Sequence, residues 1–241
     1  MVIIVRRIKM RVAILILTGL LALVSWYANA AFSLSATRVI HHESMKESSF
    51  EVYNNGDDAI LVQTWLDADG GDAPPPFALT PPLVKINPNQ HNLIRVFYQG
   101  SGLPKEKESL FWLNVLAIPV VVESEHSLHV ALQQRIKLFY RPSGLPGDVR
   151  SAPGYLRLLV KDNQLVVQNP TPYHVNISSF KQGGLEFDGD MLTPYGKIYI
   201  PAAGVQDSGR IEVAVINDFG AIDTFGGVLN NGVSEYFKLK R

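Results

Sequence analysis

The stretch SLHVALQQRIKLFYRP, residues 127–142, predicts one long β-strand that ends at a proline. Apolar residues at alternate positions share one face of this strand, namely Leu128, Val130, Leu132, Ile136 and Leu138. Twelve residues of strand reach roughly 40 Å, about twice the usual length. Soluble proteins normally protect such an edge, so an exposed one would indicate that strand pairing with another chain is its role. Core packing on an inner sheet face is the alternative.

The first thirty residues have the pattern of a secretory signal peptide. Basic residues at positions 6–11 precede an apolar run over residues 12–24, and Ala28-Asn29-Ala30 has the form of a cleavage site. The apolar run is shorter than the about 20 residues of a membrane span. We therefore expect export, a mature chain that begins at Ala31, and no stable membrane insertion after cleavage. An uncleaved anchor helix is the alternative.

Charge and cysteine content exclude several classes of protein. The whole chain has 22 basic and 22 acidic side chains. Cleavage after residue 30 would remove four basic residues and no acidic ones, which leaves 18 against 22, so the mature chain is mildly acidic. Nucleic acid is not expected as a partner, because its binding usually needs a basic patch or stripe. The absence of cysteine means that an exported chain must be stable without disulfides.

The remaining sequence predicts short strands separated by turns, without an amphipathic helix. Two prolines and two glycines within residues 142–147 predict a domain boundary. We therefore expect one β-domain over residues 31–146 and a smaller one over residues 147–241. The strands expected in the first are residues 32–40, 49–53, 60–66, 83–86, 93–98, 110–118 and 127–142, and those in the second are residues 155–160, 164–168, 174–180, 191–192, 198–200, 211–217 and 236–239.

Motifs for catalysis or metal binding are weak or missing. His41 and His42 are adjacent and would point to opposite faces of a strand, and His126-x-x-His129 has no second pair near it. The acidic run at residues 67–72 departs from the calcium-loop formula at its fifth, sixth and twelfth positions. No Walker loop, dinucleotide fingerprint or nucleophile elbow occurs. We expect no catalytic residues, no metal and no cofactor.

Six motifs, in order along the chain, carry a resemblance to a known family. They are ATRVI (36–40), TPPL (80–83), ESLFWLNVLAIP (108–119), RIKLFYRP (135–142), NPTPY (169–173) and INDFGA (216–221). Together they resemble the periplasmic chaperones of the chaperone–usher pilus pathway. The likeness looks greatest to the type 1 pilus chaperones, of the subgroup with a short loop before the long strand. The lack of a disulfide near the C-terminus is a departure that some of those members share, and the tail 230–241 matches nothing well.

The resemblance implies an all-β fold of two immunoglobulin-like β-sandwich domains in an L or boomerang arrangement. It implies a chaperone in the Gram-negative periplasm rather than an enzyme. Such a protein binds pilin subunits by donating an edge β-strand, prevents their aggregation and delivers them to an outer-membrane usher. Pilin subunits and the usher are therefore the expected partners.

The resemblance also assigns roles to eight residues. Arg38 and Lys137 would bind the C-terminal carboxylate of the pilin, a group for which two cations give strong charge-assisted bonds. Leu128, Val130 and Leu132 would belong to the donated strand. The charged residues Glu108, Arg141 and Asp218 would link the two domains and fix the angle between them.

One conflict and two alternatives accompany this hypothesis. Strict alternation places Lys137 on the opposite face from Leu132, and either a bulge or a strong local twist within residues 133–136 would restore a shared cleft. An adhesin-like binding module would bind through its loops and would give Arg38 and Lys137 no reason to converge. A sandwich hydrolase would need a cluster of acid, base and nucleophile. An exposed apolar strand also leaves self-association of the free protein open.

Overall fold

The computed structural model describes residues 31–70, 74–120, 130–234 and 236–240. These residues form nineteen strands and one short 3-10 helix, η1 (Ala152–Tyr155). None of them forms a helix that is long and apolar enough to cross a membrane. The predicted signal peptide, residues 1–30, lies outside the described residues.

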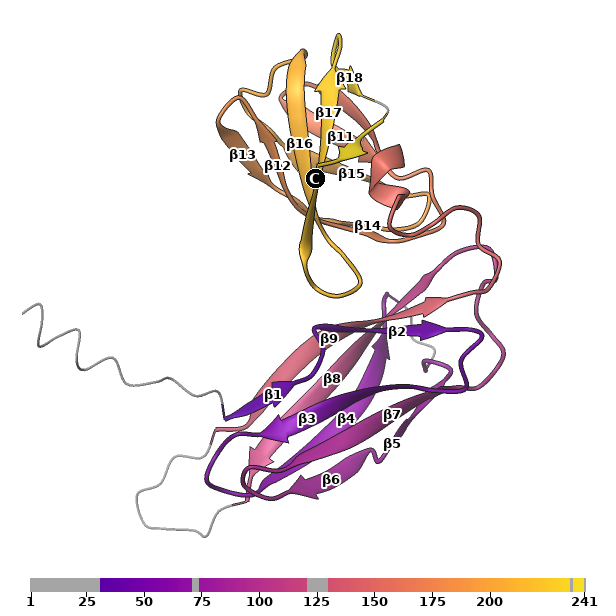
Figure 1. The fold of residues 1–241 in the computed structure, drawn as a ribbon, viewed down its shortest axis with the longest axis vertical. Helices are drawn as coiled ribbons and strands as arrows, with labels where there is room; N and C mark the ends of the chain where they lie inside the picture. The colour runs from indigo at the N-terminus through magenta and orange to yellow at the C-terminus, as the bar shows by residue number, and fades with distance from the viewer. Residues whose placement is uncertain (1–30, 71–73, 121–129, 235, 241) are drawn as a thin grey trace, which may run out of the picture. The chain divides into compact units, whose positions relative to one another are not determined.

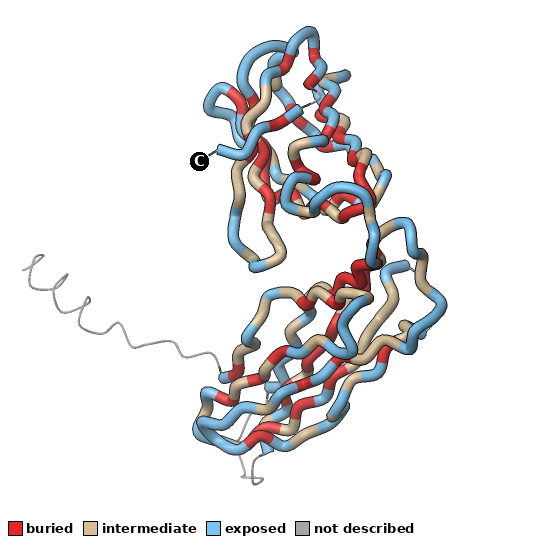
Figure 2. The backbone as a smooth tube through the Cα atoms, turned by 45° about the vertical axis from the view of Figure 1, so that its right-hand side comes forward, coloured by how far each residue is buried: buried red, intermediate tan, exposed pale blue. Residues whose placement is uncertain are grey.

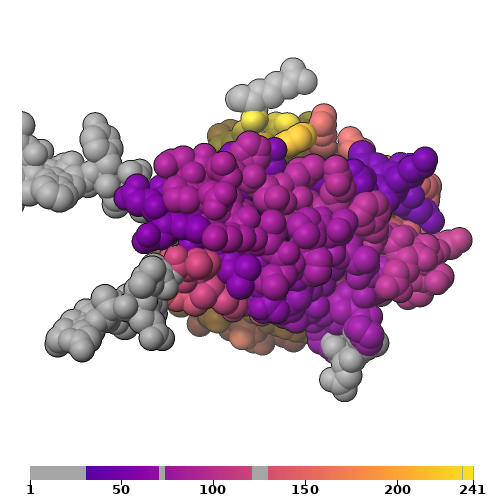
Figure 3. Space-filling view, turned by 90° about the horizontal axis from the view of Figure 1, so that it is seen from below, coloured from indigo at the N-terminus to yellow at the C-terminus, as the bar shows by residue number. Residues whose placement is uncertain are grey.

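The first half of the described chain forms a sandwich of two sheets (Figure 1). One sheet has the order β1-β3-β7-β5 and the other the order β2-β9-β8-β4-β6. The strands are β1 (Phe32–Leu34), β2 (Arg38–His42), β3 (Ser48–Asn54), β4 (Ile60–Ala68), β5 (Phe77–Thr80), β6 (Leu83–Ile86), β7 (His91–Tyr98), β8 (Ser109–Pro119) and β9 (Leu132–Arg141). In Figure 3 these indigo to magenta residues form the face turned to the viewer.

The first strand that the sequence predicts is in fact two strands in different sheets. β1 pairs with β3, whereas β2 pairs in parallel with β9 on the other sheet. Three residues, Ser35-Ala36-Thr37, separate them. A single expected strand over residues 32–40 is therefore wrong, because the chain crosses from one sheet to the other. This crossing gives β9 its neighbour and decides where that neighbour begins.

The core of this sandwich comes from alternate positions of facing strands. Val52, Leu113, Val115 and Leu138 are completely buried, and Tyr140 nearly so. Buried and exposed positions alternate along the strands in Figure 2, as expected for sheets with one face on a core. Burial of each such side chain contributes about 1.5 to 3 kcal/mol, which lets the domain do without disulfides.

The second half forms another sandwich. Its sheets have the orders β15-β11-β10-β18 and β13-β12-β16-β17-β19, with β14 paired to β12. The strands are β10 (Arg157–Lys161), β11 (Gln164–Gln168), β12 (Val175–Gln182), β13 (Leu185–Asp188), β14 (Met191–Leu192), β15 (Lys197–Pro201), β16 (Gly209–Ile216), β17 (Ile222–Leu229), β18 (Val233–Ser234) and β19 (Lys238–Leu239). It has its own core, which includes Leu158, Phe180 and Ile211.

Several predicted strands differ from those observed. β9 is described from Leu132 to Arg141, shorter than the predicted residues 127–142, and residues 121–129 lie outside the described part. The sequence analysis missed β5, which lies between two proline clusters, and also β13, β17 and β18. β17 contains Gly226 and Gly227, which have low strand propensity, and its pairing with β16 overrides that propensity.

Candidate functional site

Arg38 and Lys137 face each other across two neighbouring strands. They are register partners in the parallel pair β2–β9, so their side chains leave the sheet on the same face. Neighbouring strands lie about 4.8 Å apart. The backbones of the two residues are therefore adjacent, and their side chains are near enough for the charge of Arg38 to act on Lys137, a convergence for which the adhesin-like alternative gave no reason.

Both cations reach toward the second sandwich. Lys137 Nζ donates to Asn176 Oδ1 at 3.3 Å, and Arg38 Nη1 donates to the Ile216 carbonyl at 3.3 Å. Arg38 Nε is buried and has no hydrogen-bond partner among the described residues. Because a buried donor without a partner is costly, this place in the fold holds Arg38 at a cost in free energy.

Burial and mutual repulsion both disfavour the charged forms of Arg38 and Lys137. Burial lowers the pKa of Lys137 below its ordinary value, and the nearby charge of Arg38 lowers it further. Burial also lowers the pKa of Arg38, an effect that the charge of Asp218 opposes. Lys137 is in addition 5.7 Å from the centroid of the Trp112 ring, which favours its charged form. A carboxylate between the two cations would remove the repulsion and replace lost hydration.

Beside this pair, β9 has an open edge. β2 covers β9 only from Lys137 to Arg141. Over residues 132–136, β9 pairs with β8 on one side and with no strand of the described chain on the other. Val130 is 55% exposed and Leu132 is 44% exposed, so neither is sealed in a core. Leu128, the third residue predicted for the donated strand, lies outside the described residues.

Of the two features that would restore a shared cleft, the bulge within residues 133–136 is absent. The register between β8 and β9 is continuous from Ser109↔Tyr140 to Ala117↔Leu132. Each residue of β9 has one partner on β8, so the alternation of faces is never interrupted. Lys137 therefore stays on the opposite face from Leu132. Arg38 and Lys137 lie beside the open edge because Lys137 is the next residue of β9 after residues 132–136.

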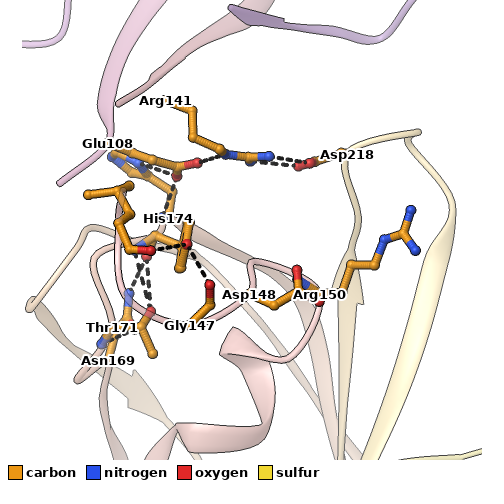
Figure 4. Close-up of polar contacts among 11 residues, drawn as sticks. Glu108, Arg141, Gly147, Asp148, Arg150, Asn169, Thr171, His174 and Asp218 are labelled. Atoms are coloured by element: carbon orange, nitrogen blue, oxygen red, sulfur yellow. Dashed lines mark hydrogen bonds and ion pairs between the residues drawn. The ribbon is translucent and has the colours of Figure 1, made fainter. Parts of the chain in front are cut away.

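Glu108, Arg141 and Asp218 form one continuous network (Figure 4). Arg141 Nε donates to Glu108 Oε1 at 2.5 Å, and its two terminal nitrogens donate to the Asp218 carboxylate at 2.7 and 3.1 Å. Glu108 Oε2 accepts from the His174 backbone at 2.7 Å. Burial alone would lower the pKa of Arg141, but the bonds and charges of Asp218 and Glu108 raise it above its ordinary value.

The turn that carries Asp218 is ordered by its own sequence. Asn217 Oδ1 accepts hydrogen bonds from the backbone nitrogens of Phe219 at 3.0 Å and Ala221 at 3.1 Å. Gly220 has φ +83° and lies so near Thr37 that a Cβ there would be 2.5 Å from its hydroxyl oxygen. Asparagine and glycine at these two positions therefore fix the hairpin between β16 and β17, and with it the carboxylate that meets Arg141.

Comparison with known protein families accounts for most of the chain. Residues 31–146 match the family described as "Pili and flagellar-assembly chaperone, PapD N-terminal domain". Residues 151–225 match "Pili assembly chaperone PapD, C-terminal domain". The chain belongs to this family of pilus-assembly chaperones.

Its relatives agree with this assignment. The chaperone is 41% identical over 194 residues to "Probable fimbrial chaperone LpfB" of Escherichia coli O157:H7. The matched region covers 78% of this chain and 84% of the relative. The crystal structure of the YadV chaperone is similar, with a TM-score of 0.73 and 35% identity over 83% of this chain and 100% of that one. So is the complex "Salmonella enterica SafA pilin in complex with the SafB chaperone", with a TM-score of 0.76 and 31% identity over 85% of this chain and 99% of the other. The expected fold of two immunoglobulin-like sandwiches is confirmed.

Two polar residues of this chaperone's site were missed by the sequence analysis. His174 has a nearly buried side chain whose Nδ1 is 3.3 Å from Glu108 Oε2. Asn169 is completely buried, donates to the carbonyls of Tyr173 at 2.7 Å and Thr193 at 3.0 Å, and accepts from the backbone nitrogen of Thr171 at 3.0 Å. The NPTPY motif was the available signal, because an asparagine beside prolines often bonds to neighbouring backbone.

A cavity of about 610 Å³ adjoins the charged network and is lined in part by His42, Arg141 and Asp218. Neither Arg38 nor Lys137 lines it, so the proposed carboxylate site is distinct from this cavity. Across the ranges that the structure describes, no three His, Cys, Asp or Glu side chains gather in a group suited to a metal ion.

Proposed function

We propose that this chaperone binds a pilin subunit by lending the open edge of β9 to the subunit's incomplete sandwich. A relative of 31% identity has been crystallised with a pilin. The observation that carries the proposal is that uncovered edge over residues 132–136, with exposed apolar residues at its start and two half-buried cations at its end. Added strands gain main-chain hydrogen bonds from such an edge and specificity from alternate side chains.

The arrangement also gives the direction of the bound strand. A strand added to the open edge occupies the line of β2, and its end nearest β2 meets Arg38 and Lys137. If that end carries the pilin's C-terminal carboxylate, the strand runs parallel to β9, in the same sense as β2. The carboxylate would then accept hydrogen bonds from Lys137 Nζ and from the guanidinium group of Arg38.

The charged network has a separate role in this proposal. Glu108 and Arg141 belong to the first sandwich and Asp218 to the second, so their bonds hold the two around the site. The chaperone would act in the periplasm after cleavage of its signal peptide, by binding rather than by catalysis. It would then pass the subunit to an outer-membrane usher. An open edge also leads us to propose that the free protein can cap itself with a second copy.

The test is co-expression with the pilins encoded beside the chaperone gene. Lys137→Ala should abolish recovery of pilin with the chaperone, and Arg38→Ala should reduce it at least ten-fold. Lys181→Ala is a matched control, because that lysine is exposed on β12 of the second sandwich. Pilin recovery that is unchanged in both cleft variants, with the chaperone folded, would overturn the proposed anchor.

A further inference from the structure

A row of apolar side chains crosses the four-stranded sheet of the second sandwich. Cross-strand register pairs Val233 of β18 with Leu159 of β10, Leu159 with Val166 of β11, and Val166 with Tyr199 of β15. The four residues therefore lie side by side on all four strands of the sheet β15-β11-β10-β18. We call this set the apolar row.

The apolar row lies on the outer face of that sheet. The neighbouring positions on these strands, Leu158, Leu165 and Val167, are completely or almost completely buried in the core, so alternation directs the row outward. Leu159 is 41% exposed, Val233 42% and Tyr199 57%. Single exposed apolar residues need no explanation, but an aligned set across a whole sheet is a feature of binding surfaces.

Basic residues border the apolar row on both sides. Arg157 and Lys197 lie two positions to one side of it on β10 and β15, and Lys161 lies two positions to the other side on β10. All three are exposed. The four strands contain no aspartate or glutamate, although the chain has as many acidic as basic residues. Lys197 Nζ is also 5.1 Å from the centroid of the Tyr199 ring, which joins the basic border to the row.

This distribution of charge disfavours a second copy as the occupant. A two-fold interface would bring the same face of two molecules together, and the three cations would meet their own counterparts without any carboxylate from these strands. The face is also small, since a standard stable interface takes about 20 to 30 residues from each side. A transient contact with a different molecule of opposite charge fits both facts.

We infer that the apolar row and its basic border dock a protein partner whose surface presents an apolar strip with carboxylates on both sides. The four strands span about 15 Å across the sheet, close to the length of three turns of helix. The face lies on the second sandwich, away from β9, so it can be occupied whether or not the proposed pilin edge is in use. An anionic lipid surface is the competing occupant, and the test separates the two.

The probe is a fifteen-residue amphipathic helical peptide with a leucine stripe flanked by glutamates, titrated into the purified chaperone labelled with nitrogen-15. We expect amide signals within residues 157–161, 164–168 and 197–201 to shift, with an affinity that weakens as salt rises. The same peptide with glutamine, or with lysine, in place of glutamate should bind at least ten-fold more weakly.

Variants locate the contact. Binding of the acidic peptide should weaken at least ten-fold in the double variant Lys161→Glu and Lys197→Glu. It should weaken at least five-fold in the separate variant Tyr199→Ser. The double reversal Arg210→Glu and Lys238→Glu, on exposed positions of the other sheet, should leave binding unchanged.

Three results would overturn the inference. One is the absence of shifts at those signals with millimolar peptide. Another is equal binding of the acidic, neutral and basic peptides. The third is loss of the same signals only with phosphatidylglycerol vesicles, which would make this face a lipid-binding surface. Repeating the titration with Lys137→Ala keeps the result independent of the proposed pilin site.

Discussion

Arg38 and Lys137 occupy the same position of the parallel β2–β9 pair, and the open edge of β9 ends directly before them. This adjacency brings together the edge proposed for strand pairing and the cations proposed for carboxylate binding, which the sequence motifs suggest only separately. In the proposed binding mode, a strand added to this edge would form backbone hydrogen bonds along residues 132–136 and would end beside Arg38 and Lys137. The repulsion between these two half-buried cations would favour a carboxylate at that end.

Removal of the charge at Lys137 should not destabilise the free chaperone. Because burial lowers the pKa of Lys137, its cation costs free energy in the folded state. Lys137→Met should therefore leave the free energy of unfolding unchanged or raise it slightly. Urea unfolding measures this, and pilin recovery with the same variant should still be lost. A loss of more than about 2 kcal/mol would show that Lys137 is structural.

Binding of the pilin terminus should weaken at alkaline pH. A bound carboxylate favours the charged lysine, so binding raises the pKa of Lys137 from its lowered free value. Affinity is constant below the free pKa and falls as pH rises through it, which happens below the ordinary pKa of 10.5. Titration with a peptide of the pilin C-terminus between pH 7 and about 10 measures this decline. Lys137→Arg, whose side chain stays charged over that range, should bind without the decline.

A charge on the open edge should block strand addition but leave the fold intact. Leu132 is 44% exposed, so Leu132→Glu should change the free energy of unfolding by no more than about 0.5 to 1 kcal/mol. A carboxylate at this place would enter the apolar interior of a bound subunit, and pilin recovery should fall at least ten-fold. Gln133 is exposed on the opposite face of the same strand, so Gln133→Glu serves as the control for charge alone. Normal pilin recovery with Leu132→Glu would contradict strand donation by this edge.

The two carboxylates of the charged network should differ in their effect on stability. Glu108 is fully buried and bonds to Arg141 and His174, so Glu108→Ala leaves buried donors without partners and should cost about 3 to 5 kcal/mol. Asp218 is partly exposed, and Arg141 keeps its bond to Glu108 when Asp218 is removed. Asp218→Ala should therefore cost only about 1 kcal/mol. Thermal unfolding of both variants tests the order, and equal losses would contradict it.

The family resemblance named the candidate residues but not the geometry that connects them. The structure places Arg38 beside Lys137 and joins Glu108, Arg141 and Asp218 in one network, whereas their roles in binding and in setting the angle between the domains stay predictions. Alternation also predicted correctly that Lys137 and Leu132 lie on opposite faces. The bulge that would have restored a shared cleft is absent, and local pattern cannot show that β9 keeps continuous register with β8.

Other features depend on tertiary context. The crossing between β1 and β2 follows from which strands they pair with, and residues 32–40 alone read as one extended segment. β17 has glycines at positions where strand propensity is low, and only its pairing with β16 makes it a strand. The role of His174 depends on Glu108, 66 positions away in sequence, which no short-range pattern contains.

In the proposed binding mode, the point at which β2 begins also sets the register of the bound strand, counted from its C-terminus. A terminal carboxylate held beside Arg38 and Lys137 fixes the numbering of every earlier residue in the visiting strand. Alternate residues, counted back from that terminus, must then face the side of Leu132. A pilin with one extra residue at its C-terminus would present the wrong set of side chains throughout, although its composition would be almost unchanged.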